Sequence, residues 1–88
     1  MLLFVLLQEV ASVEVAGQWM RMGAGLAAAL AVLGGSLGIS RIGATALESI
    51  ARQPEAANDI RSTMIVSAAL IEGVTFFAIV VCLLILFV

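Results

Sequence analysis

The 88-residue chain has no histidine, no lysine, no tyrosine, one cysteine and one proline. Without histidine or a second cysteine, Cys82 has no partner in this chain for a disulfide or a metal site, so we interpret it as a small apolar filler. Without a lysine-rich or arginine-rich tract, no patch suits nucleic-acid phosphates. The chain also lacks a phosphate-binding loop and a nucleophile–base pair. We therefore predict no catalysis, no cofactor, no metal and no nucleic acid.

Charge is scarce as well, because 11% of the residues are charged and 64% are hydrophobic. Soluble proteins carry about 25% charged residues, and a soluble chain of this length buries only a marginal core. Helices that cross a hydrocarbon core about 30 Å thick need roughly 20 apolar residues. Two stretches meet this need: residues 22–40, which are uncharged and where the helical pattern continues to about residue 50, and residues 62–88, which carry a single charged residue.

A polar segment separates the two stretches and contains the only proline, Pro54. Proline disfavours helix at the preceding residue and inside a helix, so the first helix should end there. Asn58 or Asp59 is suited to cap the second helix. This pattern predicts a helix–loop–helix hairpin.

We therefore predict an all-α membrane protein with two transmembrane helices. The first spans residues 18–50, a polar loop follows over residues 51–59, and the second helix spans residues 60–88. Residues 1–17 form an N-terminal extracytoplasmic or interfacial segment, since their apolar run is too short to span and contains no positive charge typical of a secretory leader. A leader that is later trimmed is the alternative.

Arginine distribution predicts the orientation. Arg52 and Arg61 flank the loop and Arg41 is nearest to that side, whereas Arg21 stands alone on the side of the termini. The positive-inside rule places the loop in the cytoplasm and both termini outside. Trp19 is typical of an interfacial anchor at the start of the first helix.

Small residues dominate the first stretch, and four of them alternate along the chain: Gly34, Ser36, Gly38 and Ser40. Alternate positions lie about 200° apart around a helix, so this helix has small side chains on two opposite sides. Such a helix fits between two neighbours in a closed ring of identical copies. An ordinary hairpin with one close contact along Gly34 and Gly38 explains the spacing equally well.

The second stretch carries bulky residues that suit a lipid-facing outer wall: Ile65, Val66, Leu70, Ile71, Phe76, Phe77, Ile79 and Val80. Among them stands Glu72, the only charged residue between Ser62 and Val88. An ionised acid at the centre of a membrane helix costs at least about 2.5–3.5 kcal/mol. We therefore expect Glu72 to be neutral in lipid and to ionise where water or a cation meets it, as a proton carrier does. The alternative is a structural acid that hydrogen-bonds between helices.

The stretches ALESIARQPEA and AALIEGVTFFAIV, with the small-residue helix, resemble the c subunit of F-type ATP synthases over about residues 22–88. This resemblance implies a non-catalytic subunit of a homo-oligomeric rotor ring, surrounded by lipid in the bacterial plasma (inner) membrane. It implies that Glu72 carries the ion between two half-channels of the a subunit. It also implies that Arg52, Gln53 and Pro54 contact the gamma and epsilon subunits of the central stalk, which couples ion flow to ATP synthesis.

Departures from the family pattern bear on the transported ion. Sodium-using members have a glutamine on the first helix and a serine directly after the glutamate, where this chain has Ile39 and Gly73. A hard cation needs several oxygen ligands, so we predict H⁺ as the transported ion and not Na⁺. Thr75, at i+3 from Glu72, is a candidate hydrogen-bond partner of the carboxyl, or else bonds to its own helix backbone.

If Ile39 faces the carboxylate, Arg41 points about 200° away from it, toward the ring interior or an adjacent helix. We expect its guanidinium to extend toward the cytoplasmic headgroups. Glu48, two turns further along, shares roughly the same face and is a candidate partner for it.

Two rival functions are considered, a small proton-coupled efflux transporter and a holin-like hairpin without ion chemistry. The transporter class needs more than one hairpin and an aromatic pocket, and the holin class needs neither a mid-membrane acid nor the RQPE loop. V-type proteolipids are related rotors that usually carry more than one hairpin.

Overall fold

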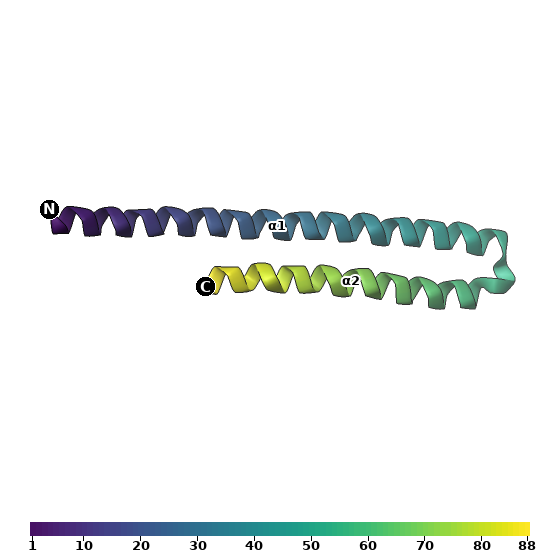
Figure 1. Cartoon of the computed structure of the whole chain (residues 1–88). Coiled ribbons are helices and arrows are strands. Elements are labelled where there is room, and N and C mark those ends of the chain that lie inside the picture. Colours follow the sequence, from purple (N-terminus) through teal and green to yellow (C-terminus); the bar gives the residue numbers. More distant parts are fainter.

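The computed structural model describes residues 1–88 as two long antiparallel helices joined by a tight turn (Figure 1). Helix α1 runs from Leu2 to Arg52, the short 3₁₀ helix η1 covers Pro54–Ala56, and helix α2 runs from Ala57 to Phe87. The hairpin measures 79 × 15 × 7 Å. Both long helices are long and apolar enough to cross a membrane. The predicted all-α, two-helix membrane hairpin is thus confirmed.

The turn is shorter than the predicted loop, because Gln53 alone separates α1 from η1. Its backbone N–H donates to the carbonyl of Ser49 at 2.8 Å, and its own carbonyl accepts from the N–H of Ala56 at 3.0 Å. Pro54 begins η1, where its missing N–H leaves no hydrogen bond unmade. These bonds reverse the chain within a few residues.

The predicted cap of the second helix is wrong. The N-cap of α2 is Ala56, which makes no side-chain capping bond. Asn58 and Asp59 lie inside the first turn, and Asp59 places its negative charge near the positive end of the helix dipole. Since η1 runs directly into α2, no turn residue is left for a capping side chain.

The two helices meet along a stripe of small residues on α1. Side chains or backbone of this stripe are buried or half-buried at every third or fourth position: Ala24, Ala28, Ala31, Gly35 and Gly38. An added Cβ on Gly38 would lie 3.1 Å from Cδ1 of Ile71. The expectation that Ile71 faces lipid is therefore wrong, because it packs against α1. Cys82 is buried between the helices, as a small filler would be.

Helix α1 extends well past the end of α2 (Figure 1). The contacts of Gly35 with Thr75 and of Gly38 with Ile71 set the register. Continued at about 1.5 Å per residue, this register places Val88 level with about residue 21 of α1, so residues 2–20 project by roughly 28 Å. The predicted N-terminal segment, residues 1–17, is thus helical from Leu2 onward and has no α2 beside it.

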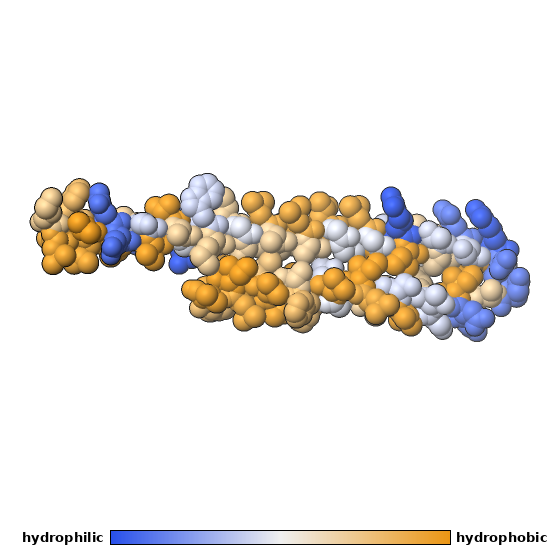
Figure 2. Space-filling model, viewed as in Figure 1, coloured by the Kyte–Doolittle hydropathy of each residue, from blue (hydrophilic) through white to orange (hydrophobic).

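Only 4 of the 88 residues are buried in the hairpin. Figure 2 shows hydrophobic surface over the middle of both helices and hydrophilic surface at the turn. The projecting part of α1 carries a second hydrophilic zone, followed by a hydrophobic N-terminal end (Figure 2). So much exposed apolar surface is stable only against lipid or other protein.

Candidate functional site

Glu72 lies in the middle of α2 with its side chain exposed. It follows Arg61 by eleven residues, which corresponds to about 16 Å along the helix and to the central part of a hydrocarbon core about 30 Å thick. The three side-chain hydrogen bonds of the chain are made by Ser62, Thr63 and Thr75, each to a backbone carbonyl. The carboxyl of Glu72 is therefore open on the flank of the hairpin.

Ile39 lies on the same flank as Glu72. Glu72 follows Ile71 and Ile39 follows Gly38, and these two preceding residues face each other across the helix pair. One residue is a turn of about 100° around a helix. In an antiparallel pair, equal turns in the chain direction lead to the same side of the hairpin. We call this side, which Ile39 and Glu72 share, the carboxylate flank.

The carboxylate flank offers no side-chain oxygen at the two positions that would supply a sodium site. Ile39 is half-buried and Gly73 is exposed. An added Cβ on Gly73 would meet no atom within 4 Å. At these two positions the carboxyl thus meets no side-chain oxygen of its own chain, whereas a hard cation needs several oxygen ligands.

The Thr75 hydroxyl donates a hydrogen bond of 2.9 Å to the carbonyl of Ile71 in its own helix. Its side chain lies against Gly35, where an added Cβ would be 2.6 Å from Oγ1. Because a hydroxyl has one hydrogen, Thr75 is left with acceptor capacity only. A bond to Glu72 therefore requires the protonated carboxyl as donor.

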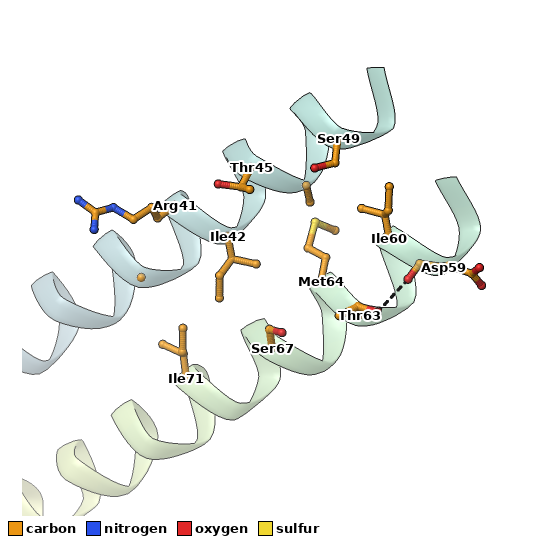
Figure 3. Close-up of a pocket in the computed structure, with 12 residues that line it drawn as sticks. Arg41, Ile42, Thr45, Ser49, Asp59, Ile60, Thr63, Met64, Ser67 and Ile71 are labelled. Atoms are coloured by element: carbon orange, nitrogen blue, oxygen red, sulfur yellow. Dashed lines mark hydrogen bonds between the residues drawn. The ribbon is translucent and has the colours of Figure 1, made fainter. Parts of the chain in front are cut away.

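Arg41 lies on the side of α1 that is opposite to the carboxylate flank. It follows Gly38 by three residues, which places it about 60° behind Gly38 and away from the carboxylate flank. We call this side the arginine flank. Figure 3 shows the Arg41 side chain directed away from the space between the helices. With Gly38 opposite Ile71, Arg41 lies about 6 Å nearer the turn than Glu72. Within one hairpin the two charges are therefore not paired.

A groove of about 590 Å³ opens between the turn-side halves of the helices (Figure 3). Hydroxyl groups from both helices line it, namely those of Thr45, Ser49, Thr63 and Ser67. The Thr63 hydroxyl is already bonded to the carbonyl of Asp59 at 3.0 Å. Glu72 is not among the lining residues, so the groove is separate from the carboxyl.

The four alternating small residues fall on different sides of α1. Gly38 is covered by Ile71 of the same chain, whereas an added Cβ on Gly34 would meet no atom within 4 Å. Ser36 and Ser40 are exposed. Sequence reasoning missed Gly35, which approaches α2 more closely than any other glycine of α1. The signal was available, because Gly35 belongs to the series of small residues spaced by three and four that ends at Gly38.

The three residues assigned to the stalk contact lie together at the tip of the hairpin. Arg52 ends α1, Gln53 forms the turn and Pro54 begins η1. All three are exposed, and the turn lies at the end of the hairpin opposite to both termini (Figure 1). One binding partner can therefore reach all three residues at once.

Comparison with known proteins agrees with this hairpin. Residues 22–85 match the model of the ATP synthase C-subunit family. The chain is 56% identical to the ATP synthase c subunit of Phocaeicola vulgatus and 55% identical to that of Bacteroides thetaiotaomicron, each over 87 residues and 99% of both chains. It is 47% identical to the ATP synthase c subunit of Lactobacillus helveticus over 66 residues, 75% of this chain and 86% of the relative. The chain belongs to the family of ATP synthase c subunits and is a bacterial membrane protein.

Proposed function

We propose that this chain is the proton-carrying rotor subunit of an ATP synthase and that Glu72 is the carrier. The single observation that carries the proposal is the position of Glu72. It is the only charged residue between Ser62 and Val88, and its carboxyl is exposed on one flank with no partner in the chain. Intramembrane carboxyl groups are costly and generally functional.

The chemistry follows from the cost of charge in lipid. A protonated Glu72 is neutral and can therefore pass along the lipid at constant depth as the ring turns. Where a fixed positive charge and water of the a subunit meet the carboxyl, the ionised form is stabilised and the proton leaves. Reprotonation from the other half-channel makes the carboxyl neutral again. Directional rotation then requires that the two half-channels open to opposite sides of the membrane and that the proton gradient drives protons from one side to the other.

The transported ion in this proposal is H⁺. Ile39 and Gly73 bring no side-chain oxygen to the carboxylate flank, and Na⁺ needs several oxygen ligands. A proton needs only the carboxyl and a partner for its hydrogen bond. The acceptor lone pair of Thr75, whose hydrogen is bonded to Ile71, is the candidate partner for the protonated form.

The partners follow from the two ends of the hairpin. Copies of the chain form a ring, and the exposed tip at Arg52, Gln53 and Pro54 bears on the gamma and epsilon subunits. The arginines on either side of the turn favour a cytoplasmic tip and external termini. Each proton that crosses delivers about 2.3 kcal/mol per 100 mV. Several protons must therefore pass for each ATP, whose chemistry takes place in other subunits.

Proton pumping by the assembled synthase in inverted membrane vesicles tests the proposal. Glu72→Gln keeps the shape of the side chain but cannot ionise, and should abolish ATP-driven acidification. Glu72→Asp should retain part of it. The control Glu9→Gln removes an exposed carboxylate of the N-terminal segment and should pump like the unmodified complex. Acidification by the Glu72→Gln complex at the unmodified rate would show that Glu72 is not the carrier.

A further inference from the structure

Three polar side chains on α1 lack a partner in the hairpin although they lie at membrane depth. Arg41, Ser36 and Ser40 are all exposed, and none takes part in the side-chain hydrogen bonds of the chain. Arg41 precedes Arg52 by eleven residues, which is about 16 Å from the turn end of α1. At such a depth an arginine and hydroxyl groups require hydrogen-bond partners.

The serines belong to a second face of α1. Ser36, Ser40 and Gly43 are spaced by four and three residues and share one helix face. We call these three residues the serine strip. It points toward the carboxylate flank and away from α2, and an added Cβ on Gly43 would meet no atom within 4 Å. Arg41 lies on the arginine flank, so one hairpin presents a donor on one side and acceptors on the other.

These two sides would meet if each copy placed its arginine flank against the carboxylate flank of the next copy. In a closed ring each copy presents one flank to one neighbour and the other flank to the next. All copies stand at the same height, and Arg41 lies between Ser40 and Gly43 along the helix. Helix side chains lean toward the N-terminus, and Figure 3 shows the Arg41 side chain running in that direction. The guanidinium therefore lies level with the serines of the neighbour.

We propose that Arg41 of one copy lies across the serine strip of the next copy and donates to the Ser36 and Ser40 hydroxyls. This inference rests on the proposed ring. Gly43 leaves room for the stem of the arginine, and the guanidinium has five N–H donors for the hydroxyl oxygens. One contact thus gives partners to all three polar side chains.

The contact also keeps the arginine away from the carrier. The serine strip is on α1 and points away from α2, whereas Glu72 is on α2. A guanidinium held by hydroxyls of the inner helix leaves the neighbouring carboxyl free to take up a proton. Arg41 is therefore a residue of the copy–copy interface and not part of the ion-binding site.

Cross-linking of the assembled ring tests the geometry. Arg41→Cys and Gly43→Cys are introduced together in a Cys82→Ala background, and membranes are oxidised. Within one helix the two cysteines point about 200° apart and cannot form a disulfide. A head-to-tail contact gives a ladder of dimers, trimers and higher multimers, and either cysteine alone gives none. Dimers only, or no cross-linked species, would overturn the proposal.

A double-mutant cycle tests the hydrogen bonds between Arg41 and the two serines. Arg41→Leu and the double variant Ser36→Ala/Ser40→Ala should each lower the temperature at which the purified ring dissociates in detergent. Combined, they should lower it no further than the larger single effect, because both remove the same contact. Additive shifts would show that the arginine and the serines act separately and would contradict the proposal.

A lipid phosphate is the competing acceptor for Arg41. If it holds the guanidinium, Arg41→Leu should have no effect on a ring from which lipid has been removed, and this result too would overturn the proposal. The readouts are independent of Glu72. A ring that forms the ladder while its Glu72→Gln variant still pumps protons would keep this contact and reject the proposed carrier.

Discussion

Gly35 and Thr75 lie so close across the hairpin that a Cβ on Gly35 would be 2.6 Å from the Thr75 hydroxyl oxygen. The hydroxyl is held in place by its bond to the Ile71 carbonyl. This contact fixes both the separation and the register of the two helices. It thereby decides which residues of α2 face α1, and it leaves Glu72 on the flank. Small residues that allow close backbone approach commonly drive helix association in lipid.

Replacing Gly35 by alanine should loosen the hairpin. Overpacking of this kind typically costs about 1–3 kcal/mol, and the expected effect lies in that range. Energy transfer between Trp19 and a probe on Val88→Cys, in a Cys82→Ala background, follows the helix separation during titration of single hairpins with SDS. The Gly35→Ala hairpin should open at a lower SDS concentration.

Two further variants control this prediction. Gly34→Ala adds the same methyl group where no atom lies within 4 Å, and should leave the single hairpin unchanged or slightly more stable. Thr75→Ala removes Oγ1 and Cγ2, the two nearest atoms to the new methyl, so adding it to Gly35→Ala should restore much of the loss. Equal effects of Gly34→Ala and Gly35→Ala would contradict the assigned register.

Oxygen ligands added beside Glu72 should create sodium binding. Ile39→Gln and Gly73→Ser place an amide and a hydroxyl near the carboxyl, and the space around Gly73 is open. The double variant should show protection of Glu72 from carbodiimide by Na⁺, since hard cations require several oxygens. K⁺ at the same ionic strength is the control. Protection of the unmodified chain to the same extent would mean that the missing oxygens do not determine the ion.

Removal of residues 2–17 should leave ring assembly and proton pumping within about a factor of two of the unmodified complex. The physical reason is that this part of α1 projects past the end of α2 and contributes nothing to the helix contact. The family match begins only at residue 22. Gel mobility of the ring and ATP-driven acidification are the measurements. Truncated chains that reach the membrane but stay monomeric would give the N-terminal segment a role in assembly.

The hairpin and the position of its membrane carboxyl could be predicted from sequence because both depend on the cost of charge in lipid. Few charged residues, two long apolar stretches and one proline between them permit few other folds. Glu72 is identified by the same cost, as the only carboxylate in the second stretch. The structure adds the flank on which it lies, which follows from the Gly35 and Gly38 contacts and not from composition.

The details that sequence did not predict depend on packing between helices. The alternating series from Gly34 to Ser40 obscures the spacing of three and four residues to which Gly35 belongs, because both spacings occur in a stretch so rich in small residues. Arg41 and Glu72 each lie eleven residues from an arginine beside the turn, Arg52 and Arg61 respectively, so counting along the chain alone would put them at the same depth. The register shows that Arg52 and Arg61 are not level, and that Arg41 and Glu72 differ in depth by about one helical turn.

Carbodiimide labelling of the purified ring tests the central claim most directly, since the reagent modifies protonated carboxyl groups in an apolar environment. Peptide mapping by mass spectrometry should find the label at Glu72 at neutral pH, to the same extent with and without Na⁺, and at none of the acids of the turn or the N-terminal segment. A Glu72 that stays unlabelled, or one that Na⁺ protects, would contradict a proton-carrying carboxyl at this position.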